Sequence, residues 1–121
     1  MAAGGAWRQD LLTVRLLGDS GSRVVWLEGE VDLSTVASLV EALDVAIADR
    51  PDLLLIDLRN VSFLDSTGLR SLLDAQEACR AIDCRLLLMR GSRPVERLMQ
   101  IAGVDGFFEF VSGPSEVASH L

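Results

Sequence analysis

The stretch "LLLIDLRNVSFLDSTGLRSLL" (Leu53 to Leu73) joins two patterns of different period. It opens with "LLLIDL" (Leu53 to Leu58), a continuous apolar run that is typical of a β-strand covered on both faces. From Leu69 onward its apolar residues have helical spacing. A strand followed directly by a helix indicates an α/β fold, in which functional groups gather where strands end. The polar turn from Asp65 to Gly68 stands at such a point.

The rest of the chain repeats this alternation. The first two expected strands, separated by the turn "GDSGS", form an antiparallel hairpin. We therefore predict a mostly parallel mixed sheet of about five strands with about four helices, in which the first strand is antiparallel. Strands are expected at Leu11 to Leu17, Val24 to Gly29, Leu53 to Leu58, Arg85 to Met89 and Phe107 to Val111; helices at Thr35 to Asp49, Ser66 to Ile82, Pro94 to Ala102 and, as a short last element, Gly113 to Leu121.

Length and composition fit one soluble domain. The chain has 121 residues, half of them hydrophobic, which suffices for a core. We expect residues 1–10 to form a flexible tail and residues 11–121 to form the domain. No apolar stretch approaches the ~20 residues that a membrane span needs. The start lacks the basic segment and apolar block of a secretion signal, so a cytoplasmic location is the default expectation.

Charge and residue types exclude several functions. The net charge of −7 opposes direct nucleic-acid binding, which needs a basic surface, but permits a basic protein partner. All eleven cationic residues are arginine, so no lysine can act as a base or a phosphate clamp. Zinc sites need about four ligands, whereas the chain offers Cys79, Cys84 and a single histidine, His120. We expect no metal and no cofactor; a Cys79–Cys84 disulfide is conceivable, but inert packing is the favoured interpretation.

The D-S-T-G turn holds more polar groups than a helix start requires. Either Ser66 or Asp65 could cap the helix, a contribution of ~1 kcal/mol, and Thr67 adds a third candidate. Gly68 falls in the first helical turn, where glycine costs ~1 kcal/mol relative to alanine but allows another molecule to approach closely. Arg70 opposes the helix dipole, which suggests that it meets an anion.

Phosphorylation of Ser66 would account for these features. A phosphate adds roughly two negative charges and is favoured at a helix N-terminus. The fold should therefore tolerate the group. A partner docked on the same turn should not, because Asp65 already makes the surface negative and close contact would desolvate the new charge. The hypothesis is a switch that acts through an interface without refolding.

Three blocks of the chain resemble the signature blocks of STAS domains. They are "GEVDLSTVASLVEAL" (Gly29 to Leu43), "LLLIDLRNVSFLDSTGLRSLL" (Leu53 to Leu73) and "VERLMQIAGVDGFFEF" (Val95 to Phe110). The chain looks most like the stand-alone bacterial anti-sigma factor antagonists, and the likeness runs from about Leu11 onward. The D-S-T-G turn is its most specific part; the family often has D-S-S-G there, and threonine in the third position is a common variant.

The resemblance implies a partner-switching function without catalysis by the domain itself. The unmodified antagonist would bind an anti-sigma factor that is a GHKL-type serine kinase, and the sigma factor would be released. The kinase would phosphorylate Ser66 using ATP, the modified form would dissociate, and a PP2C-type phosphatase would reset it. Thr67 matches a second hydroxyl that some relatives modify. The predicted partner-binding residues are Asp32 of the "GEVD" loop, Asp65, Ser66, Thr67, Gly68 and Arg70.

Other functions fit the residues less well. In a response-regulator receiver Asp57 would be the acceptor, but Gly18 rather than an acidic pair follows the first strand, and lysine is absent. A serine hydrolase needs a histidine base and a G-x-S-x-G turn. Ser66 instead lies in a D-S-T-G turn, and the single histidine is His120 near the end of the chain. Two alternatives stay open within the STAS family: a scaffold or regulatory subunit of a larger stress-signalling assembly, and a weak nucleotide-binding module, although no phosphate-binding G-x-x-x-x-G-K-[ST] loop is present.

Overall fold

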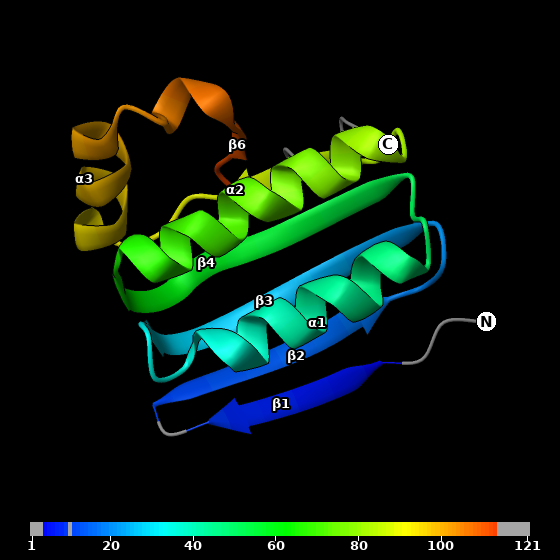
Figure 1. Cartoon of the computed structure of the whole chain (residues 1–121), viewed down its shortest axis with the longest axis horizontal. Helices are drawn as coiled ribbons and strands as arrows, with labels where there is room; N and C mark the ends of the chain where they lie inside the picture. The colour runs from blue at the N-terminus through cyan, green and yellow to red at the C-terminus, as the bar shows by residue number, and fades with distance from the viewer. Residues whose placement is uncertain (1–3, 10, 114–121) are drawn as a thin grey trace.

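The computed structural model describes residues 4–9 and 11–113. These residues form one six-stranded sheet in which strands adjacent in sequence are adjacent in space (Figure 1). The strands are β1 (Gly5–Gln9), β2 (Leu12–Gly18), β3 (Ser22–Val31), β4 (Leu53–Leu64), β5 (Arg85–Met89) and β6 (Glu109–Val111). The helices are α1 (Val36–Ala48), α2 (Ser66–Ala81) and α3 (Arg93–Ala102), with a 3-10 turn, η1 (Asp105–Phe107).

Strand directions follow from the connections. The strands β1 and β2 pair antiparallel, and so do β2 and β3, which a short turn joins. The pairs β3–β4, β4–β5 and β5–β6 are parallel, as expected where a helix carries the chain back across the sheet. The predicted α/β fold, with a mostly parallel sheet and an antiparallel start, is confirmed.

The N-terminal segment differs from the sequence-based expectation. Residues 1–10 were expected to form a flexible tail, whereas Gly5–Gln9 form strand β1 at the edge of the sheet. The strand is held by backbone pairing with β2, and Trp7 packs against the core. A segment stabilised mainly by its backbone leaves little trace in an apolar pattern. The expected last helix, Gly113 to Leu121, lies outside the described residues from position 114 onward.

The main core lies between the sheet and helices α1 and α2, which sit side by side on one face (Figure 1). Alternate residues of β4, such as Leu54 and Ile56, point into this core and are fully buried. The residues between them, Leu53 and Leu55, belong to a second buried cluster with Leu87 of β5. Strand β4 is therefore buried on both sides, which explains its unbroken apolar run.

Strands β3 and β4 are longer than the apolar pattern predicts. Their pairing continues past Gly29 and Leu58 to the pair Val31–Leu64. The register shifts near Gly29, which has a φ of +120°; a Cβ there would lie 1.8 Å from the carbonyl oxygen of Leu11. Glycine is thus required at this irregularity. The extension carries the ends of both strands out to the edge where α1 and α2 begin.

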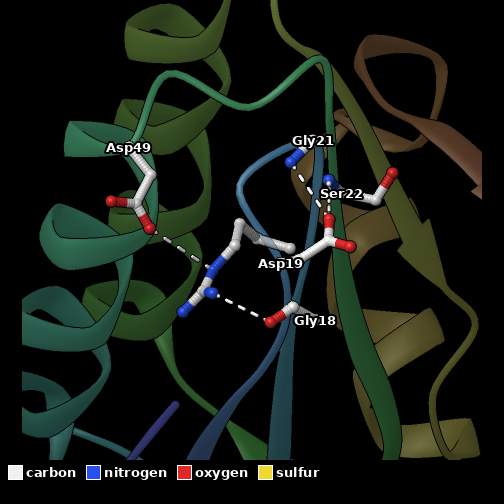
Figure 2. A network of polar contacts seen from close by, with 6 residues as sticks. Gly18, Asp19, Gly21, Ser22 and Asp49 are labelled. Carbon is white, nitrogen blue, oxygen red and sulfur yellow. Dashed lines mark hydrogen bonds and ion pairs between the residues drawn. The ribbon is translucent and has the colours of Figure 1, made fainter. Parts of the chain in front are cut away.

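A buried arginine connects two segments at the opposite end of these strands. Arg23 at the start of β3 is fully buried, and its Nη1 donates a hydrogen bond to the Gly18 carbonyl oxygen at 3.0 Å (Figure 2). Its Nε lies 3.6 Å from Oδ2 of Asp49, which follows α1. In the adjoining turn, Oδ1 of Asp19 accepts the Gly21 N–H at 3.1 Å. One side chain thus ties the β2–β3 turn to the end of α1.

Replacing Arg23 with alanine is expected to lower the free energy of unfolding by about 3 kcal/mol, because a buried side chain and its polar contacts are lost together. Arg23→Met should cost clearly less, since methionine fills much of the volume and leaves no buried donor. Urea unfolding followed by circular dichroism measures both. A loss below about 0.5 kcal/mol for Arg23→Ala would contradict this role.

Candidate docking and modification site

The carboxyl ends of β3 and β4 meet at one place. The backbone N–H of Asp65, just after β4, donates to the carbonyl oxygen of Val31 at the end of β3, at 3.1 Å. The backbone N–H of Leu33 also hydrogen-bonds the Asp65 carboxylate. Asp32 lies close enough to Asp65 for the two charges to influence each other. The "GEVD" loop and the D-S-T-G turn are therefore neighbours in the structure.

Asp65 is the residue that caps α2. Its Oδ1 accepts the Gly68 N–H at 3.0 Å and the hydroxyl of Thr67. Partial burial is the largest single influence on this carboxylate and opposes its ionisation. The hydrogen bonds from Thr67, Gly68 and Leu33 together outweigh it, so the pKa of Asp65 lies below its ordinary value. Asp65 is therefore ionised at neutral pH.

Ser66 is left free by this arrangement. It is the first residue of α2 and is exposed. Its hydroxyl has no hydrogen-bond partner within residues 4–9 and 11–113. Sequence reasoning allowed either Ser66 or Asp65 to be the cap; because Asp65 takes that role, the Ser66 oxygen remains accessible beside a helix N-terminus.

Asp32 is held in place by the loop that enters α1. Its Oδ1 accepts the N–H of Ser34 at 2.9 Å and the Ser34 hydroxyl at 2.7 Å, and its own N–H donates to Oγ1 of Thr35 at 3.0 Å. The Ser34 hydroxyl contributes most to lowering the pKa of Asp32 below its ordinary value, against partial desolvation and the charge of Asp65. Two ionised carboxylates thus lie close to each other here, and one of them, Asp65, directly precedes Ser66.

Glycine is required at position 68 for a different reason from the one expected from the sequence. A Cβ there would lie 2.4 Å from Cδ1 of Leu64 and 2.8 Å from Cγ1 of Val31. Gly68 is buried, and its bare backbone lets α2 press against the ends of β3 and β4. The expectation that this backbone is open to another molecule is wrong, because the space is filled by the protein's own side chains.

Arg70 has an anionic partner within its own helix. Its Nε lies 3.2 Å from Oδ1 of Asp74, one turn further along, and both side chains are mostly exposed. Such surface pairs contribute little to stability. The expected anion for Arg70 is therefore present in the unmodified chain, and its side chain points away from the core.

Two exposed apolar side chains near the ends of β3 and β4 were not predicted from the sequence. Leu33 is 77% exposed and Phe63 is 45% exposed, although both are large and hydrophobic. Phe63 belongs to the part of β4 beyond the apolar run and pairs with Glu30. Val61 and Leu64 are both buried while Ser62 and Phe63 between them are exposed, so this part of β4 does not alternate and gave no periodic signal for Phe63. We name Asp32, Leu33, Phe63, Asp65 and Ser66 the docking edge.

Asp57 is engaged elsewhere. It is 3% exposed, and its carboxylate accepts the backbone N–H of Arg59 at 3.0 Å, Nε at 3.1 Å and Nη2 at 2.9 Å. The backbone N–H and the guanidinium of Arg59 therefore both bind this carboxylate. A carboxylate enclosed in this way is a structural group.

The two cysteines are free thiols, and both are buried. Burial, reinforced by the adjacent Cys84, raises the pKa of Cys79 to about 12, which makes it a poor nucleophile.

In the described part of the chain no cluster of three or more His, Cys, Asp or Glu residues could hold a metal ion. No helix there has the length and apolar character to cross a bilayer.

Comparison with known proteins places this geometry in a family. The family model described as STAS domain matches residues 14–117. The chain is 36% identical over 103 residues to the anti-sigma-F factor antagonist RsfB of Mycobacterium tuberculosis, covering 85% of this chain and 84% of the relative. It is 32% identical over 93 residues to an anti-sigma-B factor antagonist of Listeria monocytogenes, covering 77% and 82%. A crystal structure of an anti-sigma factor antagonist from Mycobacterium paratuberculosis superposes with a TM-score of 0.78 at 27% identity, covering 92% and 94%.

Substituting Gly68 with alanine is expected to lower the free energy of unfolding by about 1–3 kcal/mol, although alanine is the better helix former. The added methyl group would collide with Leu64 and Val31. Thermal and urea unfolding measure the change, with Ala78→Gly in the same helix as a control for helix propensity. Stabilisation by Gly68→Ala would show that the packing is looser than described.

The Asp65 cap should depend on pH. A carboxylate whose folded-state pKa is lowered stabilises the fold above its unfolded-state pKa, and this contribution disappears as the pH falls through the folded-state pKa. Asp65→Ala is therefore expected to cost about 1 kcal/mol at pH 7 and less as the pH falls from about 5 toward 2. Urea unfolding of both proteins across this range tests it; a constant difference would contradict the ionised cap.

Proposed function

The chain belongs to the STAS domain family, and on that premise we propose that it is an anti-sigma factor antagonist of a partner-switching pathway. In this proposal the unphosphorylated protein binds an anti-sigma factor that is itself a GHKL-type serine kinase. The bound sigma factor is thereby released. Phosphorylation at Ser66 abolishes binding, and a PP2C-type phosphatase restores it. The protein acts by binding, in the cytoplasm, and carries out no chemistry itself.

One observation carries the proposal: the exposed hydroxyl of Ser66 stands at the start of α2 while Asp65 caps the helix. A kinase needs a serine oxygen that it can reach, and this one is not committed to the fold. The neighbouring Thr67 hydroxyl is half-buried and donates to Asp65. Ser66 is therefore favoured over Thr67 as the modified residue.

The local structure suits a phosphate at Ser66. The first N–H groups of a helix and its dipole favour negative charge. Adding the group to an exposed side chain displaces no packed atoms. The phosphorylated protein should consequently keep its fold, and the switch should operate in the complex.

The same phosphate would oppose a docked partner. Asp65, which directly precedes Ser66, and Asp32, whose charge interacts with that of Asp65, are both ionised, so a dianion at Ser66 adds to the negative charge of the docking edge. The exposed Leu33 and Phe63 imply that a partner must approach closely to bury them. Juxtaposed or desolvated like charges in such a contact cost several kcal/mol.

Substitutions at Ser66 should separate the two states. Ser66→Ala is expected to bind the anti-sigma factor like wild type, because the hydroxyl carries no structural role. Ser66→Glu should bind at least tenfold more weakly while its melting temperature changes little. The partner is captured from the source cells with Ser66→Ala protein, purified, and titrated by calorimetry.

Phosphosite mapping completes this test. Incubation with the captured partner and ATP should label wild-type protein at Ser66, and Thr67→Ala should be labelled equally. A label on another residue with Ser66 clean would reject the assignment, and equal affinity of wild type, Ser66→Ala and Ser66→Glu would reject the charge mechanism. Recovery of a large multi-subunit particle in place of a kinase would favour a scaffolding role.

A further inference from the structure

One side of α2 forms a continuous line that starts at the docking edge. Ser66, Arg70, Leu73 and Glu77 follow one another at intervals of four, three and four residues, which places them on the same side of the helix. All are exposed except Leu73, which is half-buried. A molecule seated on Ser66 therefore has a path along this side of α2.

The line leads to a groove. An opening of about 360 Å³ lies between α2 and the connection from α3 to η1. Its apolar floor is formed by Leu73 of α2 and by Val104 and Phe107 of the connection. Phe107 is 43% exposed despite its size. The groove therefore offers an apolar floor to solvent, where a protein side chain could bury it.

The walls of this groove are fixed to each other. The side chain of Gln76 on α2, which is itself buried, donates through Nε2 to the carbonyl oxygen of Phe107 at 3.0 Å. The guanidinium of Arg80 lies 5.0 Å from the centre of the Phe107 ring, and the ring of Phe108 meets it edge-on at 5.9 Å. Binding would require little free energy for ordering the groove, because its shape is already fixed in the unbound protein.

The rim selects the charge of the occupant. Asp74 and Glu77 line one side, and the only cation among the lining residues, Arg70, is already paired with Asp74. The whole chain carries a net charge of −7. The best complement is an apolar side chain flanked by arginine or lysine.

We propose that this groove is a second docking site for the same anti-sigma factor that contacts Ser66, and that it receives an apolar anchor of that protein between basic side chains. This inference rests on the proposed function. Because the groove begins about one helical turn beyond Ser66, one partner can occupy both places. The groove lies outside the modified residue, so it contributes affinity and partner choice in a way that phosphorylation does not alter.

Calorimetry with the purified anti-sigma factor tests the groove through two matched pairs of variants. Glu77→Arg, on the rim, is compared with Glu41→Arg, the same charge change on the exposed side of α1. Phe107→Ala, in the floor, is compared with Ile101→Ala, an exposed apolar residue of α3 outside the groove. We expect Glu77→Arg and Phe107→Ala to weaken binding at least tenfold and both controls to stay within twofold. Raising the salt concentration should reduce the difference in binding affinity between Glu77→Arg and wild type, because salt screens the charge of Glu77.

The outcomes separate this inference from the proposed function. If Ser66→Glu weakens binding while Glu77→Arg matches Glu41→Arg, the groove is overturned and the switch stands. If Glu77→Arg weakens binding while Ser66→Glu binds like wild type, the groove stands and the switch fails. Should the floor variant prove unstable by thermal unfolding, the rim variant alone decides, since an exposed glutamate bears no part of the core.

Discussion

The extended parallel pairing of β3 and β4 is the constraint on which the site depends. Beyond the apolar run the two strands stay paired as far as Val31 and Leu64, and the hydrogen bond from Asp65 N–H to the Val31 carbonyl closes the gap between them. Without that contact the loop holding Asp32 and the start of α2 would be separate pieces of surface. With it they form a single edge.

The D-S-T-G turn divides its tasks among adjacent residues. Asp65 satisfies the helix end, Thr67 supports Asp65, and Gly68 admits the close approach of α2 to the sheet. These three are needed by the fold, and Ser66 between them is not. A modification there can thus alter the charge of the surface while the contacts beneath it stay as they are.

The architecture could be predicted well from the sequence because the periodicity of apolar residues indicates its main strands and helices directly. The double-sided burial of Leu53–Leu58 and the helical stripe after Leu69 are strong, local signals. The pairing beyond Leu58 gave no such signal, since its residues are partly polar and held by backbone hydrogen bonds. The same reason hid β1, whose contacts are chiefly those of its main chain with β2.

The candidate site was predictable in position and less so in detail. Motif and chemistry selected Ser66 as the candidate, but the cap could have been either Ser66 or Asp65, because both side chains suit that place. The environment of Gly68 and the exposure of Leu33 depend on which atoms pack nearby, which no local pattern records. The groove beside Phe107 combines α2 with a connection that comes only after α3, and it could not be anticipated.

Since the cap belongs to Asp65, adding or removing a group at Ser66 should leave the unfolded fraction nearly constant. The same molecules could then be modified and restored many times without an increase in their degradation by proteases, which act on the unfolded state. The size of the pool would be set by synthesis alone, and the signal by how that pool is divided.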